Sequence, residues 1–129
     1  MGMIDRGFSV ALAASQLSDA PRIGLRMGAS LFTGSRLLAV GANLYSRSHP
    51  DSRQANEFTY STHAEHVCLL KRRHYDVTSN LTMYVARRRS DGSIGSSRPC
   101  KNCLELCKRA DISRVWYYTS RGERQEIVL

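Results

Sequence analysis

Two short segments of the sequence hold the side chains that most constrain its fold. One segment is His63-Ala64-Glu65, and the other is Pro99-Cys100-Lys101-Asn102-Cys103, which starts 34 residues after Glu65. Each segment stands at the start of a predicted helix. Side chains three residues apart share one face of a helix, and the positive end of a helix favours thiolates, so Cys100 and Cys103 present two sulfur ligands together. The fold must bring these sulfurs to His63 if the two segments form one metal site.

One imidazole and two thiolates would make a three-ligand metal site. Zinc suits this set better than magnesium or calcium, which prefer oxygen donors. Three protein ligands leave the fourth zinc position to water, as catalytic sites do, and zinc lowers the pKa of that water toward ~7. Glu65 is two residues from His63, a spacing that does not set two helical side chains side by side, so we predict that Glu65 carries protons instead of binding the metal. The alternative is a structural zinc knot.

The four cysteines also allow two disulfides if the chain is secreted. The N-terminal residues lack the sections of a signal peptide, and no apolar stretch approaches the ~18 residues that cross a bilayer, so we expect a cytoplasmic protein without a membrane segment. Three cysteines within eight residues of such a chain favour metal binding. Cys68 and Cys107 fall among apolar helix positions and are expected to be small buried side chains, and His66 a core or surface histidine.

Helical and strand patterns alternate along the chain. Apolar residues recur every three to four positions in the first 17 residues, and Pro21 follows, which predicts a helix. Gly34-Ser35 is a short polar connection between two apolar runs, which predicts a hairpin. Thr62 and Glu65 have the spacing of a capping box at the start of another helix. The expected elements are helices over Ile4–Leu17, Thr62–Tyr75 and Cys100–Ala110 and strands over Met27–Thr33, Arg36–Asn43, Leu81–Ala86 and Ile112–Tyr118.

This order of elements predicts an α/β fold with one sheet covered by helices on both faces. The 129 residues, of which 42% are hydrophobic and 23% charged, predict a single domain over residues 1–129. Two polar segments, Tyr45–Ser61 and Arg87–Arg98, are expected to be loops, and the length of the first favours a functional role. Residues 120–129 form a short segment of mixed composition, for which the sequence predicts no secondary structure.

The chain carries a net charge of +8, and 16 of its 19 basic residues are arginines. The planar guanidinium suits bidentate contact with phosphate, so an anionic partner is one interpretation and a soluble basic surface is the other. The runs Lys71-Arg72-Arg73 and Arg87-Arg88-Arg89 leave the same choice, between contact with a single-stranded nucleic acid and a solvated surface that complements a helix dipole. Both interpretations remain open from the sequence.

His-x-Glu followed by Pro-Cys-x-x-Cys resembles the signature of the zinc-dependent cytidine deaminase superfamily, and the order of the expected elements from residue 4 to residue 118 is similar to that family as well. The resemblance implies a three-layer α/β/α fold with a mixed five-stranded sheet, although the sequence does not place the fifth strand. It implies zinc held by His63, Cys100 and Cys103. It also implies that Glu65 protonates the substrate's ring nitrogen and then its leaving amine, so that ammonia departs and a carbonyl remains.

The same resemblance suggests substrate contacts. Gly41-Ala42-Asn43 resembles a Gly-x-Asn sequence at the end of the second strand in many members, where the asparagine holds the sugar of the substrate. Tyr117 and Tyr118 end the last expected strand, near where the family's substrate loop begins, and both stacking on a base and core packing remain open for them. The expected substrate contacts are Asn43, Ala64 and Tyr118.

Histidine as the first ligand resembles the deoxycytidylate, tRNA-adenosine and polynucleotide-cytosine branches of the superfamily more than the free-nucleoside branch. Together with the excess of arginine, this favours cytosine on a deoxycytidylate-like monophosphate as the substrate. One alternative is a cytosine or adenosine deaminase that acts on single-stranded DNA or RNA. Another is a non-catalytic, zinc-containing module that binds nucleic acid. The resemblance also implies homo-oligomers, because members of the family frequently form dimers, tetramers or hexamers.

Overall fold

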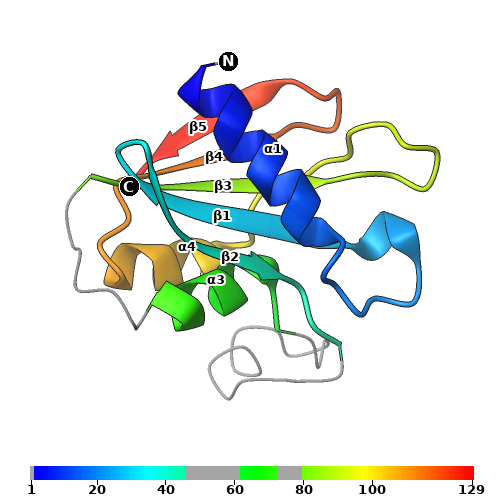
Figure 1. Cartoon of the computed structure of the whole chain (residues 1–129), viewed down its shortest axis with the longest axis horizontal. Coiled ribbons are helices and arrows are strands. Elements are labelled where there is room, and N and C mark those ends of the chain that lie inside the picture. Colours follow the sequence, from blue (N-terminus) through cyan, green and yellow to red (C-terminus); the bar gives the residue numbers. More distant parts are fainter. Residues whose placement is uncertain (1, 46–61, 73–79) are drawn as a thin grey trace.

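A computed structural model of the chain describes residues 2–45, 62–72 and 80–129. A five-stranded sheet in the order β2-β1-β3-β4-β5 lies at its centre, with helices against both faces (Figure 1). This arrangement confirms the expected three-layer α/β/α fold with a mixed sheet. The elements are the helices α1 (Met3–Ser15), α3 (Ala64–Arg72) and α4 (Lys101–Arg109), the short 3-10 helix η1 (Ile23–Leu25), and the strands β1 (Met27–Thr33), β2 (Arg36–Ala42), β3 (Leu81–Arg87), β4 (Arg114–Tyr118) and β5 (Arg124–Val128).

The predicted hairpin is present at one edge of the sheet. β1 and β2 pair antiparallel, and Gly34 in their connection has a φ of 56°, a left-handed conformation that glycine adopts at little cost. β1 also pairs antiparallel with β3, so it is covered on both sides and is almost entirely buried. β2 ends at Ala42, and Asn43 therefore follows directly after the strand.

β3 and β4 form the parallel pair, with α4 between them in the chain. Where these strands end, Ser97 joins them. Its hydroxyl donates to the carbonyl oxygen of Val85 at 2.7 Å and accepts from the backbone N–H of Tyr118 at 2.9 Å, and its own N–H donates to the Tyr118 carbonyl at 3.0 Å. The carboxyl ends of parallel strands are a frequent location of ligand sites. Ser97 fixes the segment that leads into Pro99 and Cys100 to this edge.

α1 covers one face of the sheet (Figure 1). The ring of Phe8 packs against Tyr84 and Tyr118, with centroids 5.6 and 4.3 Å apart. Phe32 adds an edge-to-face contact with Tyr84 at 5.7 Å. Offset and edge-to-face pairs of this kind stabilise a core beyond the burial of their area, so this face is an aromatic layer.

α3 and α4 cover the opposite face, where aliphatic and sulfur side chains form the core. Cys68 and Cys107 have no exposed surface. Burial raises the pKa of the Cys68 thiol to about 12, and the Cys107 thiol lies 3.9 Å from the sulfur of Met83. The structure confirms that both cysteines are small buried side chains.

The start of α3 differs from the prediction. The helix begins at Ala64, and the first carbonyl to accept a helical hydrogen bond is that of His63, from the Val67 N–H at 3.0 Å. The backbone of Thr62 instead pairs with Leu44 in an isolated bridge, so the predicted capping box is wrong. The expected end of this helix near residue 75, and nearly all of the expected loop over residues 45–61, lie outside the described residues.

β5 is the strand that the sequence did not reveal. It pairs antiparallel with β4 at the second edge of the sheet, and four of its five residues are exposed. Arg124 in β5 donates to the carboxylate of Asp5 in α1 at 2.6 Å and lies over the ring of Phe8, which ties the end of the chain to the first helix. In the ranges that the structure describes, no helix is long and apolar enough to span a membrane.

Candidate metal centre and active site

His63, Cys100 and Cys103 meet where α3 and α4 begin, on the face of the sheet away from α1. His63 directly precedes α3. A Cβ on Gly41 in β2 would stand 2.7 Å from the Ala64 carbonyl oxygen, so only glycine at that position lets the start of α3 lie so close to the sheet. Cys100 is the N-cap of α4, and its sulfur accepts a hydrogen bond from the backbone N–H of Cys103 at 3.4 Å.

The three donor atoms lie within 4.8 Å of one another. Nδ1 of His63 is 3.3 Å from the sulfur of Cys103 and 3.7 Å from that of Cys100. Zinc bonds of about 2.1 Å to nitrogen and 2.3 Å to sulfur, at a tetrahedral angle, place the two donors about 3.6 Å apart. The observed separations lie on either side of that value, so the donor set fits zinc. His66 is buried but does not belong to this group of donors.

The protonation of the two thiols also fits a cation at this point. The hydrogen bond from the Cys103 thiol, with help from His63, lowers the pKa of the Cys100 thiol to about 4 although burial opposes this. The pKa of Cys103 is raised, because its thiol donates that hydrogen bond and is buried. The hydrogen bond with Cys100 also raises the pKa of His63. Metal binding would displace the proton that the two sulfurs share.

Glu65 lies in the first turn of α3, is 2% exposed and lines the same cavity as His63 and Cys100. Burial raises the pKa of its carboxyl group, and the positive charge of His63 partly opposes that effect. A buried carboxyl group whose pKa is raised holds a proton more readily than an exposed one, which suits a group that accepts and releases protons. The arrangement can therefore move a proton next to a metal-bound water.

The cavity in front of this site has a volume of about 290 Å³. Asn43 and Ala64, two of the expected substrate contacts, lie in its wall. The amide of Asn43 is held by the backbone: Oδ1 accepts from Met27 N–H at 2.9 Å, and Nδ2 donates to the Leu25 carbonyl at 2.8 Å. The amide keeps one donor and one acceptor for a ligand. The described residues around the cavity are Leu25, Met27, Asn43, Tyr45, His63, Ala64, Glu65, Arg87, Arg98 and Cys100.

Tyr118, the third expected substrate contact, is not brought to this cavity. Its ring packs on Phe8 under α1, on the other face of the sheet. Successive residues of a strand point to opposite faces, so Tyr117 is the tyrosine on the face of the metal site. Its hydroxyl accepts a hydrogen bond from Arg98 at 3.1 Å. Of the two interpretations left open for Tyr118, the structure therefore shows core packing.

Arg87 and Arg98 also line the cavity, and the sequence did not single them out as site residues. Arg87 belonged to a basic run with two open interpretations, and Arg98 was taken as the end of a loop. The position of Arg98 directly before Pro99-Cys100 is a signal that could have identified it, since the residue next to a ligand segment lies near the site by chain connectivity alone. For Arg87, only the tertiary structure gives this information.

The comparison with protein families agrees with the site. The model of the cytidine and deoxycytidylate deaminase zinc-binding region matches residues 3–119. The chain therefore belongs to this family of zinc-binding proteins, and His63, Cys100 and Cys103 are the described residues that could hold its zinc. No curated protein sequence matches the chain significantly.

Solved structures share the fold at low sequence identity. The cytidine deaminase from Burkholderia pseudomallei superposes with a TM-score of 0.69 at 17% identity, covering 96% of this chain and 91% of that one. The dCMP deaminase from the cyanophage S-TIM5, in complex with dCMP and dUMP, superposes with a TM-score of 0.63 at 20% identity, covering 89% of this chain and 79% of that one. These similarities establish a cytidine deaminase-like fold.

Proposed function

We propose that this protein is a zinc-dependent hydrolase that converts cytosine to uracil on a deoxycytidylate-like monophosphate and releases ammonia. The observation that carries the proposal is the convergence of one buried carboxyl group with a three-ligand zinc site on one cavity. A purely structural zinc site has no need of a carboxyl group whose burial raises its pKa.

Each residue of the site has a separate role in the proposed reaction. Zinc held by His63, Cys100 and Cys103 would supply a water that is acidic enough to react at neutral pH. Glu65 takes up a proton in the cavity, passes it to the ring nitrogen beside the amino-bearing carbon, and later carries a proton to the departing amino group. One water is consumed, the carbon–nitrogen bond breaks, a carbonyl forms and ammonia leaves. Asn43, with its amide fixed by Leu25 and Met27, holds the sugar of the substrate, and Ala64 borders the base.

An anionic substrate is supported by the charges around the cavity. Arg87 and Arg98 contribute two positive charges to its wall, and the negative groups there are Glu65, when it is ionised, and the Cys100 thiolate, whose charge a bound zinc ion would offset. The phage relative of similar fold was solved with dCMP and dUMP, which are a monophosphate substrate and product. A monophosphate needs only one or two fixed cations, which agrees with this arrangement.

Direct assay of the purified protein tests the proposal. Cytidine, deoxycytidine, their monophosphates, single-stranded DNA and single-stranded RNA are each incubated with the protein, and uracil and ammonia are measured. We expect the highest kcat/KM on deoxycytidine monophosphate and no activity in a Glu65→Gln control. If unphosphorylated cytidine were the best substrate at every salt concentration, the assignment of a phosphorylated substrate would be wrong.

A polynucleotide substrate is the second candidate, and its supporting observation is the net charge of +8. A protein that tracks a nucleic acid backbone loses affinity steeply as salt rises, because each neutralised phosphate releases counterions. Activity that is higher on single-stranded DNA or RNA and collapses with salt would therefore favour this candidate. Tight binding of nucleic acid without turnover would favour a non-catalytic zinc module.

We also propose that the protein self-associates in the cytoplasm. A domain of 129 residues gains stability from burying a further apolar surface, and Leu17 and Ile23 are 62% and 59% exposed. Light scattering over a wide range of protein concentration should give a mass above that of the monomer. A monomeric mass at every concentration would contradict the proposal.

A further inference from the structure

Among the described residues, two guanidinium groups line the cavity, and they differ in the contacts that hold them. Arg87, at the end of β3, is enclosed by backbone. Its Nε donates to the Ser96 carbonyl at 2.9 Å and its Nη1 to the Gly24 carbonyl at 2.8 Å. A Cβ on Gly95 would lie 2.7 Å from its Nη2, so the third nitrogen is closely packed as well. Arg87 joins the segment before β1 to the segment before α4 with two of its five N–H donors, which fixes its guanidinium group against the backbone.

Arg98 is exposed and is held mainly by one aromatic side chain. Its Nη1 donates to the hydroxyl of Tyr117 at 3.1 Å, and the guanidinium lies 5.6 Å from the centroid of the same ring. The Tyr117 hydroxyl donates in turn to Oε1 of Gln125 at 2.8 Å, which fixes its lone pairs toward Arg98. A guanidinium has five N–H donors, so this arrangement orients Arg98 and leaves most of its donors available.

The partners of Arg98 are neutral. Within the part of the chain that the structure describes, no acidic side chain forms an ion pair with it, whereas Arg114 and Arg124 pair with Glu126 and Asp5. A cation that is oriented by a phenol and not neutralised by a carboxylate keeps its full attraction for an anionic ligand. The planar fork of arginine matches the oxygens of a phosphate group in a bidentate contact.

We propose that Arg98 binds the phosphate group of a mononucleotide substrate, and that Tyr117 is the residue that positions it. This inference rests on the proposed function and names the residue that selects a phosphorylated substrate. Because Arg98 and Cys100 line one cavity and are two residues apart, a ligand held by Arg98 reaches the zinc site within the same cavity.

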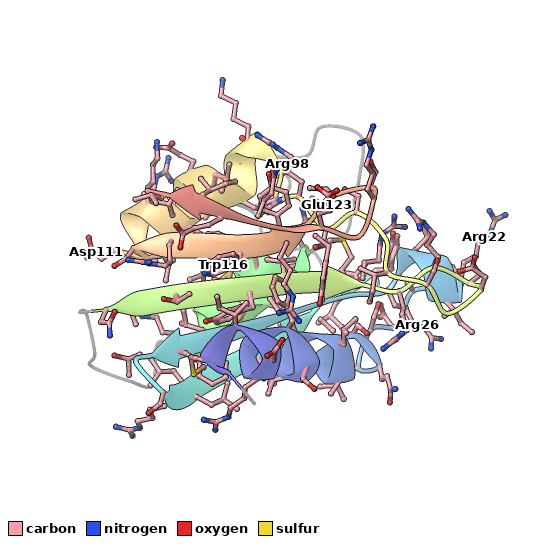
Figure 2. The ribbon with its side chains drawn as sticks, turned by 90° about the horizontal axis from the view of Figure 1, so that it is seen from above. Arg22, Arg26, Arg98, Asp111, Trp116 and Glu123 are labelled. Carbon is pink, nitrogen blue, oxygen red and sulfur yellow. The ribbon has the colours of Figure 1, made fainter. Side chains whose placement is uncertain are left out.

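The size of the cavity favours a mononucleotide over a polynucleotide. A volume of about 290 Å³ is at the lower end of the range for small-ligand sites. A polynucleotide needs a basic groove that follows its backbone. Figure 2 shows Arg22 and Arg26 at the end of the molecule near η1, away from Arg98.

The test compares variants on a matched pair of ligands. Binding of dUMP and of deoxyuridine is measured by calorimetry, and kcat and KM are measured on deoxycytidine monophosphate and deoxycytidine. We expect Arg98→Gln to reduce the preference for the phosphorylated ligand about 10- to 100-fold, the loss of charge-assisted hydrogen bonds, with affinity for the nucleoside unchanged. Tyr117→Phe, which keeps the ring and removes the hydroxyl, should raise KM for the monophosphate by a smaller factor at constant kcat.

Arg109→Gln is the matched control. Arg109 is exposed at the far end of α4, and its substitution removes the same charge as Arg98→Gln. Zinc content is measured in every variant, and Arg98→Lys provides a second substitution if Arg98→Gln lowers it: a lysine keeps the charge without the fork and should retain only part of the preference. Equal losses in Arg98→Gln and Arg109→Gln, or an unchanged preference in both Arg98 variants, would overturn the inference.

The binding measurement separates this inference from the proposed function. If the wild-type protein binds dUMP more tightly than deoxyuridine through Arg98 but deaminates none of the substrates, the phosphate site is supported and the proposed reaction is refuted. A protein that deaminates deoxycytidine and its monophosphate equally well, with Arg98→Gln unchanged, would keep the reaction and refute the phosphate site. Tighter binding of a single-stranded oligonucleotide than of dUMP, lost equally in Arg98→Gln and Arg109→Gln, would also refute it.

Discussion

The same strands form both faces of the sheet, but the two faces have different roles in the protein. Under α1, the rings of Phe8, Tyr84 and Tyr118 pack together, and the buried hydroxyl of Ser30 donates to a helix carbonyl at 2.8 Å. Under α3 and α4, the structure buries a carboxyl group, Glu65, at the edge of a zinc site. Burial of an ionisable group costs free energy, whereas aromatic packing stabilises. The face under α1 is therefore a packing layer, whereas the face under α3 and α4 combines its own core with a buried ionisable group.

On each face, one glycine of the hairpin strands lets a helix pack closely against the sheet. A Cβ on Gly28 would fall inside the contact distance of a backbone oxygen of α1, and one on Gly41 would do the same with the Ala64 carbonyl of α3. On the first face the close approach only increases contact area. On the second it seats the start of α3, which carries His63 and Glu65, against the sheet. The comparison predicts that the two faces can be damaged independently.

The largest expected effect is loss of the metal. Cys103→Ala, or removal of zinc with a chelator, should abolish activity, because a thiolate ligand has no substitute among the described donors. Zinc per chain is measured by metal analysis. Cys107→Ala is the control, since Cys107 is buried in the same helix and is no ligand, and should lose stability but keep zinc. Stoichiometric zinc in Cys103→Ala would remove Cys103 from the site.

Glu65→Gln is expected to have the next largest effect. It should lower kcat by roughly 10² to 10⁴, the usual contribution of general acid–base catalysis, because it keeps the shape of the side chain and removes its proton transfer. Zinc content and melting temperature should stay close to wild type. Glu105→Gln, an exposed residue of α4, serves as the control. Near wild-type turnover in Glu65→Gln would mean that another group carries the proton.

Damage to the aromatic face should change stability and not chemistry. Phe8 is 1% exposed, and Phe8→Ala should lower the free energy of unfolding by about 3–5 kcal/mol through the cavity that it leaves. Urea denaturation measures this loss, and kcat/KM per folded molecule should not change. Val128→Ala, at a position that is 70% exposed, should have little effect on either quantity. A parallel loss of zinc in Phe8→Ala would show that the faces are coupled.

The smallest expected effect concerns the ion pair between α1 and β5. The hydrogen bond and charge of Arg124 hold the pKa of Asp5 below its usual value of 3.8. A depressed pKa contributes stability that is present above the unfolded-state value and disappears as pH falls through the folded-state value. Asp5→Asn should therefore shift the urea midpoint slightly at neutral pH and not at strongly acidic pH. If the double variant Asp5→Asn/Arg124→Gln has the same urea midpoint as Asp5→Asn alone, the ion pair between these residues is the source of the shift.

The sequence predicted the elements whose signals are local. The hairpin at Gly34 depends on two turn residues between apolar runs, and the zinc ligands depend on the spacing of Cys100 and Cys103 on one helix face. The strand β5 was not predicted because an edge strand exposed on most of its residues needs no alternation of apolar side chains. Its pairing with β4 is a tertiary interaction.

Two errors at the site have the same cause. Thr62 resembles an N-cap in sequence, but its backbone pairs with Leu44, which lies beside it only in the folded chain. Tyr118 and Tyr117 are adjacent in sequence and point to opposite faces of the sheet, so a displacement of one residue changes the partner from Arg98 to Phe8. Sequence patterns identify the chemistry of a side chain more securely than the face on which it lies.

The ligands of the zinc site come from two helices that the chain connects by a long path. His63 and Cys100 are 37 positions apart, so one ion held by both is a cross-link that closes a loop of that length. Unlike a disulfide, this cross-link is reversible, and its contribution follows mass action: each tenfold rise in free zinc above the dissociation constant adds about 1.4 kcal/mol to the stability of the folded chain. The temperature at which this protein unfolds would therefore report the zinc supply of its surroundings.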